Sequence, residues 1–147
     1  MSTAEEGVRL ASKRFYTALN LMANGDASQM ADAWSHGPEV SAQHPIEGRE
    51  IGWEAVKPSF EQFAQIATDG NIELKDQLIR AEGDFAYELG VEQGACKLGG
   101  HQVAFKHRVT NIYRREGGEW RMIHHHSDTS PAMMAVLARL QAPAVTK

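Results

Sequence analysis

The spacing of apolar residues changes near Asn71, and this change limits the possible fold more than any other feature of the sequence. Before Asn71, apolar side chains recur every three or four positions, as in amphipathic helices. After it, they recur at every second position, as in strands that bury one face. Helices followed by a run of strands predict an α+β domain in which helices cover one face of a mostly antiparallel sheet.

Three helices and one short strand are predicted in the first half of the chain. The first helix is expected from about Ala4 to Ala23, and a short second helix covers Met30 to Trp34. An extended segment from Glu39 to His44 follows, because a residue that precedes proline avoids the helical region. The third helix carries apolar residues from Trp53 to Ala67 and is expected to end at Asp69-Gly70.

Four meandering strands are predicted in the second half. Turn residues separate them at Ala81 to Asp84, at Gly99-Gly100 and at Gly117-Gly118. A glycine pair readily adopts the positive φ angles of a tight hairpin turn. Pro131 opens a C-terminal helical segment that extends through Leu140. The element order is therefore helix, helix, short strand, helix, four strands and a final helical segment.

The strand that begins at Phe85 shows the clearest alternation. Its apolar residues Phe85, Tyr87, Leu89 and Val91 alternate with Ala86, Glu88, Gly90 and Glu92. A sheet covered on one side by helices buries its apolar positions and exposes the others. The alternation therefore predicts that Glu88 and Glu92 lie on a solvated face.

The composition is that of one globular domain. The chain has 147 residues, is 42% hydrophobic and carries a formal net charge of −4. We expect a single domain over residues 1–147, with an ordered core from about residue 4 to about residue 140. No clustered basic face predicts contact with nucleic acid or an anionic membrane. No segment resembles a signal peptide or a membrane span, so a cytoplasmic location is expected. The single Cys96 excludes an intramolecular disulfide.

The hairpin from Val109 to Asp128 carries the densest set of reactive side chains, His124-His125-His126-Ser127-Asp128. Strand alternation places Trp120, Met122, His124, His126 and Asp128 on one face, and Arg121, Ile123, His125 and Ser127 on the other. The bulk of Trp120 and Met122 favours burial of the first face. We predict that this face points into a pocket, with Trp34 or Trp53 in its wall. The competing interpretation is that the same face meets a second copy of the chain.

Several segments together resemble the SnoaL-like group of the nuclear transport factor 2-like superfamily, which includes ketosteroid isomerases and scytalone dehydratase. The resemblance covers almost the whole chain. It rests on Phe15-Tyr16, Asn24-Gly25-Asp26, Trp34, His44-Pro45, Gly52-Trp53-Glu54-Ala55-Val56, Arg108-Val109-Thr110, Gly118-Glu119-Trp120-Arg121 and His124-His125-His126-Ser127. It implies a cone, in which a curved sheet wraps around three N-terminal helices and encloses a mostly apolar pocket. It also implies homodimers that pack sheet against sheet. Because members of this family differ in activity, function must be argued from the site.

Three residues are candidate catalytic groups. His126 is the preferred base because histidine titrates near neutral pH, and Asp128 would orient its ring. His44, at the end of a short strand near the expected pocket rim, is a second candidate base. The alternatives are structural: the histidines bond to backbone or carboxylate groups at the strand end or the dimer face, His44 satisfies its loop, and Asp128 caps the helix that Pro131 begins.

Six further residues are candidate substrate contacts: Tyr16, Trp34, Trp53, Phe60, Arg108 and His124. Arg108 or Tyr16 would stabilise charge that develops on the substrate. The competing interpretation makes the aromatic residues ordinary core and Arg108 a surface or interface charge. His124 and His126 share a face but have no fixed third ligand, so no metal is expected. No cofactor is expected either.

These features predict a small-molecule-binding protein whose pocket performs acid–base isomerase, cyclase or dehydratase chemistry on an apolar, carbonyl-bearing or polycyclic substrate. The alternative is a non-catalytic association domain or a ligand carrier. The expected partners are a small apolar molecule and a second copy of the chain. The second copy would bind the outer face of the sheet through Ile123 and either Ile112 or Tyr113.

Overall fold

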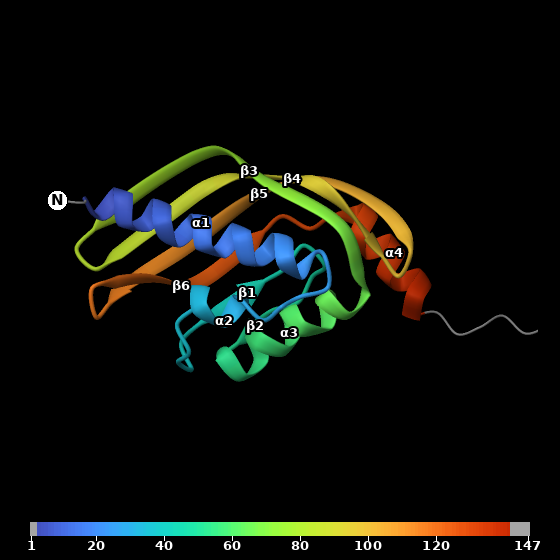
Figure 1. The fold of residues 1–147 in the computed structure, drawn as a ribbon, viewed down its shortest axis with the longest axis horizontal. Helices are drawn as coiled ribbons and strands as arrows, with labels where there is room; N and C mark the ends of the chain where they lie inside the picture. Colours follow the sequence, from blue (N-terminus) through green and yellow to red (C-terminus); the bar gives the residue numbers. More distant parts are fainter. Residues whose placement is uncertain (1–2, 142–147) are drawn as a thin grey trace, which may run out of the picture.

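A strongly curved, six-stranded sheet and four helices make up the computed structural model, which describes residues 3–141 (Figure 1). The helices are α1 (Ala4–Met22), α2 (Met30–Ala33), α3 (Trp53–Ile66) and α4 (Pro131–Gln141). The strands are β1 (Ser41–Gln43), β2 (Glu50–Ile51), β3 (Ala67–Glu82), β4 (Phe85–Leu98), β5 (His101–Glu116) and β6 (Glu119–Ser127). The α+β cone and the predicted order of elements are confirmed. The two-residue β2 was not expected, because its segment has the composition of a loop.

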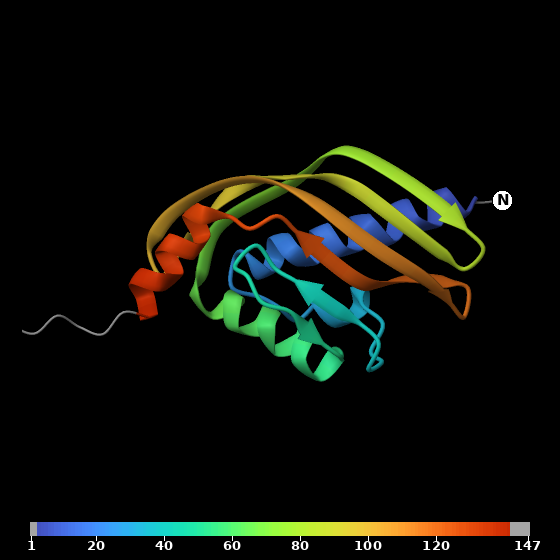
Figure 2. The ribbon, with the colours of Figure 1, turned by 180° about the vertical axis from the view of Figure 1, so that it is seen from behind.

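The strands are ordered β2-β1-β6-β5-β4-β3 in the sheet. Strands β3 to β6 form an antiparallel meander, and β1 joins its edge parallel to β6. Figures 1 and 2 show α1 along the concave side of the sheet, with α3 and the β1–β2 pair below it. Helix α4 packs against β5 at the end where β4 turns into β5. The helices and the concave face therefore enclose the interior.

Helix α1 fills most of this interior. Thr3 caps it, because its hydroxyl oxygen accepts a hydrogen bond of 3.1 Å from the Glu6 amide. Its buried stripe includes Val8, Phe15 and Leu19. Phe15 is completely buried, and its ring contacts aromatic rings from three other elements: Trp34 after α2, Phe60 of α3 and His125 of β6. One helix face therefore ties the sheet to the smaller helices.

Strand β3 bends sharply through two irregularities in its pairing with β4. Register shifts occur between Thr68 and Asn71 and between Lys75 and Leu78. Asp69 and Asp76 lie in these segments with φ of 52° and 55°, which is unusual for residues other than glycine. The prediction that Asp69-Gly70 ends the third helix is wrong, since β3 already begins at Ala67. These turn-forming residues instead make a bulge that curves the sheet.

The predicted alternation of β4 is present, but its two faces are reversed. Glu88 is 0% exposed and Glu92 is 3% exposed, whereas Phe85 and Tyr87 are 54% and 44% exposed. The prediction of a solvated face for the two glutamates is therefore wrong. Their carboxylates accept hydrogen bonds from side chains on the concave side, which offsets the loss of hydration.

The predicted alternation of β6 fails after Met122. Tyr113 pairs with Met122, but the next residue, Ile112, pairs with His124, so Ile123 is an extra residue in β6. Trp120 and Met122 are buried as predicted, and beyond the bulge the buried residues are His125 and Ser127. The predicted inward direction of His124 and His126 is therefore wrong, because one inserted residue turns the rest of a strand over.

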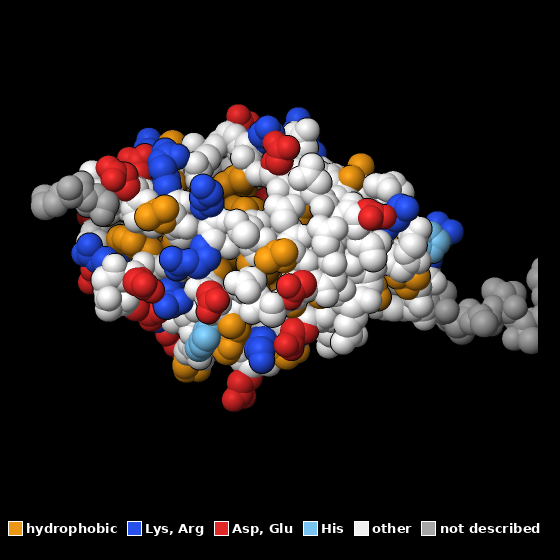
Figure 3. Space-filling model, viewed as in Figure 1, with side chains coloured by type: hydrophobic (Ala, Val, Ile, Leu, Met, Phe, Trp, Pro, Cys, Tyr) orange, Lys and Arg blue, Asp and Glu red, His pale blue; other side chains and the backbone are white. Residues whose placement is uncertain are grey.

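Charged side chains of both signs are mixed over the molecular face shown in Figure 3. Lysine and arginine are interspersed there with aspartate and glutamate, and no continuous basic patch covers this face. Among the helices of residues 3–141, none has both the length and the apolar character that a membrane span requires.

The close contact between β3 and β4 predicts a strong effect of one added methyl group. A Cβ atom on Gly94 would collide with the backbone carbonyl oxygen of Asn71 and would lie 3.0 Å from Ile72 Cα. We expect Gly94→Ala to lower the free energy of unfolding by about 2 kcal/mol or more. Urea denaturation checks this, with the exposed neighbour Gln93 as control. A Gly94→Ala protein as stable as Gln93→Ala would contradict the role assigned to this contact.

Candidate functional site

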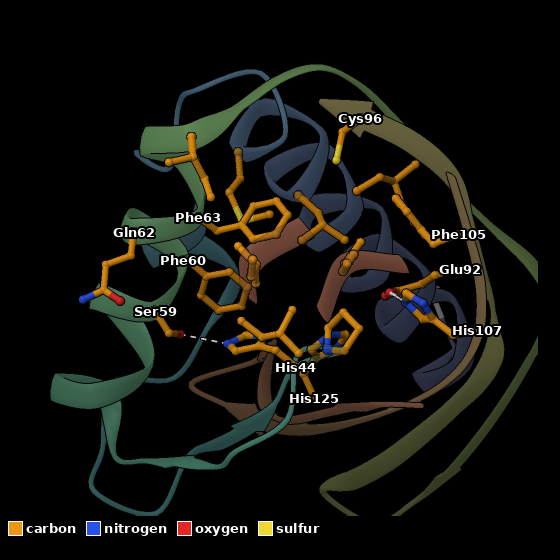
Figure 4. A pocket seen from close by; sticks show the side chains of 18 of the residues that line it. His44, Ser59, Phe60, Gln62, Phe63, Glu92, Cys96, Phe105, His107 and His125 are labelled. Atoms are coloured by element: carbon orange, nitrogen blue, oxygen red, sulfur yellow. Dashed lines mark hydrogen bonds and ion pairs between the residues drawn. The ribbon is translucent and has the colours of Figure 1, made fainter. Parts of the chain in front are cut away.

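A cavity of about 230 Å³ lies between α3, α4 and the concave face of the sheet (Figure 4). Its wall is mostly apolar, and its polar side chains come from the loop after β1 and from β2, α3, β4, β5, β6 and α4. The apolar lining residues are Leu19, Met22, Pro45, Ile46, Phe60, Phe63, Ile66, Ile72, Cys96, Phe105, Met133 and Leu137. The polar lining residues are His44, Glu50, Ser59, Gln62, Glu92, His107, His125 and Gln141.

Glu92 is a buried carboxylate held by two donors. His107 Nε2 donates to Glu92 Oε1 at 2.9 Å, and the Tyr16 hydroxyl donates to Glu92 Oε2 at 2.8 Å. Burial would by itself raise the pKa of Glu92, but these hydrogen bonds and the nearby histidines bring it below its ordinary value. Burial and the Glu92 charge raise the pKa of Tyr16. At neutral pH the pair is therefore a carboxylate and a protonated phenol.

Asn111 fixes the protonation pattern of His125. Its amide Nδ2 donates to the Tyr16 hydroxyl at 3.0 Å and to Glu88 Oε1 at 2.9 Å. Both amide protons are then used, so the 2.7 Å contact between Asn111 Oδ1 and His125 Nδ1 requires a proton on Nδ1. Burial lowers the pKa of His125 more than the Glu92 charge raises it. His125 is therefore a neutral imidazole whose unprotonated nitrogen is Nε2.

His44 is a second neutral imidazole beside His125. The Ser59 hydroxyl donates to the Val56 carbonyl, so Ser59 Oγ accepts from His44 Nε2 at 2.8 Å. Burial, together with the neighbouring His125, lowers the pKa of His44 to about 3. The two imidazole rings lie 6.0 Å apart, and Figure 4 shows them together on one side of the cavity. His44 Nδ1 and His125 Nε2 are the two unprotonated ring nitrogens of this pair.

A second carboxylate continues the network behind the cavity. Glu88 accepts from the Tyr113 hydroxyl at 2.8 Å, from Gln77 Nε2 at 2.7 Å and from Asn111. Burial and the Glu88 charge raise the pKa of Tyr113. Glu88 does not line the cavity. It serves as an acceptor that orients the Asn111 amide, and through it His125.

Some of the residues predicted for the site reach the cavity. His44 and Phe60 line it. Tyr16 does not line it but donates a hydrogen bond to the lining residue Glu92. Trp34 and Trp53 do not line it: Trp34 is completely buried in the core, and Trp53 stacks on His36 with ring centroids 4.6 Å apart. The prediction that one of these tryptophans forms the pocket wall is wrong, because both pack between α2 and α3.

The remaining predicted residues lie outside the cavity. His124 Nδ1 shares a hydrogen bond of 2.8 Å with the Ser41 hydroxyl. Arg108 is exposed, and its Nε pairs with Asp128 Oδ2 at 2.7 Å, so Asp128 bonds Arg108 rather than orienting a histidine. His126 is exposed and borders only a shallow surface depression beside this pair. The bulge at Ile123 accounts for the outward direction of both histidines.

The sequence did not predict a role in the site for Glu92, His107, Asn111 or His125, nor for the residues around Glu88 behind the cavity. One signal was present. A two-residue turn at Gly99-Gly100 pairs Leu98 with His101, and counting back along both strands places Glu92 directly opposite His107 and Glu88 opposite Asn111. Each of these cross-strand pairs joins a carboxylate to a side chain that can donate a hydrogen bond, and both pairs lie on the same face of the sheet. Such pairs indicate a polar cluster. The pairing of Asn111 with His125 had no such signal, because it depends on the bulge.

Other chemistry finds less support in the described residues. Within residues 3–141, no group of three or more His, Cys, Asp or Glu side chains is arranged to hold a metal ion. Burial raises the pKa of Cys96 to about 11, so this cavity-lining thiol is protonated at neutral pH and is a poor nucleophile. The polar groups suited to chemistry are therefore the histidines and carboxyl groups.

Residues 8–133 match the SnoaL-like domain family. The chain belongs to this family. The solved structures that resemble this SnoaL-like domain place it in the nuclear transport factor 2-like superfamily. One is a proposed dehydratase of that family from Streptomyces avermitilis, with 25% identity, a TM-score of 0.76, and coverage of 86% of this chain and 96% of that chain.

Two further structures show the same fold. An NTF2-like protein of unknown function from Pseudomonas putida KT2440 has 26% identity, a TM-score of 0.71, and coverage of 87% of this chain and 88% of that one. An NTF2-like superfamily protein from Salmonella enterica has 16% identity, a TM-score of 0.73, and coverage of 83% of this chain and 87% of that one. A search among curated proteins gives no match. The predicted membership of the SnoaL-like group is confirmed.

The lowered pKa of His44 predicts a loss of stability in acid. The unfolded chain binds a proton at this histidine near pH 6.5, whereas the folded chain binds it only near pH 3. Stability conferred by neutral His44 is therefore complete above about pH 6.5 and is lost as the pH falls below it, by about 2 kcal/mol between about pH 7 and pH 5. Burial also lowers the pKa of His125, so this residue contributes to the same loss of stability in acid.

Urea denaturation at both pH values measures this difference. We expect His44→Gln to show a clearly smaller loss between about pH 7 and pH 5 than the wild-type protein, because glutamine does not titrate. The exposed His126→Gln serves as control and should retain the wild-type loss. Equal losses in all three proteins would show that His44 is not the group responsible.

Proposed function

We propose that this SnoaL-like protein binds a small, mostly apolar molecule in the α3–α4 cavity and catalyses proton transfer on it, as an isomerase or a dehydratase. The observation that carries the proposal is the state of His125. This buried, neutral imidazole donates from Nδ1 to Asn111 and leaves Nε2 as an unprotonated nitrogen on a cavity-lining residue. A general base requires such a fixed nitrogen with its lone pair available.

The surrounding residues suit the protonated state that follows. When His125 Nε2 takes a proton from a carbon of the bound molecule, the ring becomes a cation. The Glu92 carboxylate favours that cation, since its charge raises the pKa of His125. His107 and Tyr16 hold Glu92 in place through their hydrogen bonds. The apolar wall keeps water away from the reacting atoms, which strengthens this electrostatic effect.

Two reactions follow from one base. In isomerisation, the C–H bond breaks and its electron pair forms a new double bond, while an existing adjacent double bond of the substrate breaks and its electron pair takes the proton that His125 returns at the far carbon. In dehydration, the C–H electron pair forms a double bond as the neighbouring C–O bond breaks, and His125 delivers the proton to the departing hydroxide as water. His44, which is neutral and lies 6.0 Å from His125 between ring centroids, is placed to contact the same substrate. The likeness to a proposed dehydratase at 25% identity supports this class.

Adjacent histidines on β6 provide a matched test. His125→Asn removes Nε2, while the asparagine amide can still donate to Asn111 Oδ1. We expect turnover of a substrate found by screening to fall at least about 100-fold in this variant. His126→Asn changes an exposed residue one position away and should leave turnover within about twofold. Circular dichroism and melting temperature show whether each variant is folded.

The opposite pattern would refute the assignment. Folded His125→Asn protein with wild-type turnover would exclude His125 as the base. Loss of turnover in His126→Asn, with His125→Asn active, would instead favour the surface histidine.

We also propose that the convex face of the sheet binds a second copy of the chain. Its exposed apolar side chains include Phe85, Tyr87, Leu89 and Leu78, and Ile112 pairs with Tyr87 on the neighbouring strand. A contiguous apolar surface of this kind usually marks an interface. Tyr113, which was expected here as an alternative to Ile112, is fully buried on the concave side and cannot contribute.

Sedimentation analysis at micromolar concentration tests this proposal. The double variant Tyr87→Lys/Leu89→Lys should sediment as a monomer, because lysines on the apolar face oppose its burial. Leu10→Lys, which changes a 63% exposed leucine on α1, should remain a dimer. A monomeric wild-type protein, or a dimer that survives the double substitution, would contradict the proposed interface.

A further inference from the structure

The volume of the cavity limits the size of its ligand. A cavity of about 150 Å³ with apolar walls holds one benzene molecule. The present cavity of about 230 Å³ therefore holds one ring with a few substituents, or two fused rings. By the same proportion, a four-ring skeleton would require roughly 400 Å³. Four-ring substrates, which belong to the polycyclic class expected from the sequence, are too large for this cavity.

The charges around the cavity select against anions. Glu50 and Glu92 contribute carboxyl groups, and no lysine or arginine among residues 3–141 lines the wall. His44 and His125 are neutral near pH 7, because burial lowers the pKa of each. A bound carboxylate or phosphate would be repelled by Glu92 without a compensating cation, in surroundings where water screens poorly.

The hydrogen-bonding groups around the cavity are mostly acceptors. His44 Nδ1 and His125 Nε2 are lone-pair nitrogens, as their bonds to Ser59 and Asn111 require. Glu50 Oε2 is buried and has no hydrogen-bond partner among the described residues. His107 Nδ1 is likewise buried without a partner there, since the bond to Glu92 uses Nε2. Buried acceptors of this kind are stabilised by a ligand that supplies O–H or N–H groups.

We propose that the ligand of this cavity is an uncharged alcohol or phenol of one or two rings, whose hydroxyl group donates to the histidine and glutamate acceptors. The inference rests on the proposed function, since the nitrogen that accepts this hydrogen bond is the His125 base. It adds a substrate class. When the hydroxyl group sits on a saturated carbon, it also supplies the leaving group that dehydration needs: the C–O bond breaks, and the hydroxide departs as water with the proton that His125 delivers.

Binding of simple probes, measured by titration calorimetry at about pH 8 where carboxyl groups are ionised, tests each part of the proposal. Benzyl alcohol is the reference probe. Benzyl methyl ether has a similar shape but no donor, and benzoate carries a negative charge. We expect binding at least about tenfold weaker for the ether and still weaker for benzoate. The two-ring 2-naphthol should bind, and a four-ring hydroxysteroid should not.

Each contrary result overturns a specific part of the proposal. Equal or tighter binding of the ether removes the requirement for a donor, and equal or tighter binding of benzoate removes the charge selection. Tight binding of the hydroxysteroid removes the size limit. If none of the five probes binds at millimolar concentration, the ligand class is wrong.

Variants of two glutamates separate a local from a general charge effect. Glu50→Gln neutralises a lining carboxyl group and should improve benzoate binding about tenfold. Glu54→Gln changes an exposed residue outside the cavity and should have no effect. No gain for benzoate in Glu50→Gln, or the same gain in both variants, would overturn the assigned role of Glu50.

The failure of this inference is distinguishable from failure of the proposed function. The probes are measured at equilibrium, so their ranking does not depend on turnover. The expected ranking with no turnover dependent on His125 would refute the catalytic proposal and leave the ligand class intact. Turnover that depends on His125 but acts on an anionic substrate would refute the ligand class alone.

Discussion

The interior of this protein depends on the side-chain hydrogen bonds of one residue, Asn111. Its amide group donates to Tyr16 and Glu88 and accepts from His125, so it joins α1, β4 and β6 from the middle of β5. No other orientation of the amide satisfies all three partners, because Glu88 only accepts in its ionised form. The protonation pattern of the cavity follows from that orientation, since it determines which nitrogen of His125 carries the proton.

Burial of two carboxylates without lysine or arginine partners is the main electrostatic problem of the fold. Glu88 and Glu92 together receive five hydrogen bonds, from Gln77, Asn111, Tyr113, Tyr16 and His107. Such bonds to charged groups contribute more than bonds between neutral groups, and they offset much of the lost hydration. Removing any one donor would leave charge uncompensated in a region of low polarity. The network therefore holds its side chains in fixed positions, which suits the proposed role of His125 as a base.

The same arrangement joins stability to function. A cavity inside the cone reduces packing, and neutral His44 and His125 are expected to make the fold sensitive to acid. Both features would be removed by filling the cavity with apolar side chains. Their presence in a chain with an otherwise continuous apolar core supports the proposal that the cavity binds a ligand.

The amino-acid sequence by itself determined the helices, every strand except β2, their order and much of the strand pairing. Apolar periods of three to four and then of two separated helices from strands, and the glycine pairs at residues 99–100 and 117–118 fixed two hairpins. The first of these turns also places Glu92 opposite His107. Only the tertiary structure decided which face of each strand turns inward. Alternation has a period but no direction, so Glu88 and Glu92 were assigned to the wrong face of β4. The extra residue Ile123 then turned His125 inward in place of His126. The segment from Trp120 to Ser127 contains no glycine, asparagine or aspartate that would mark this bulge in the sequence.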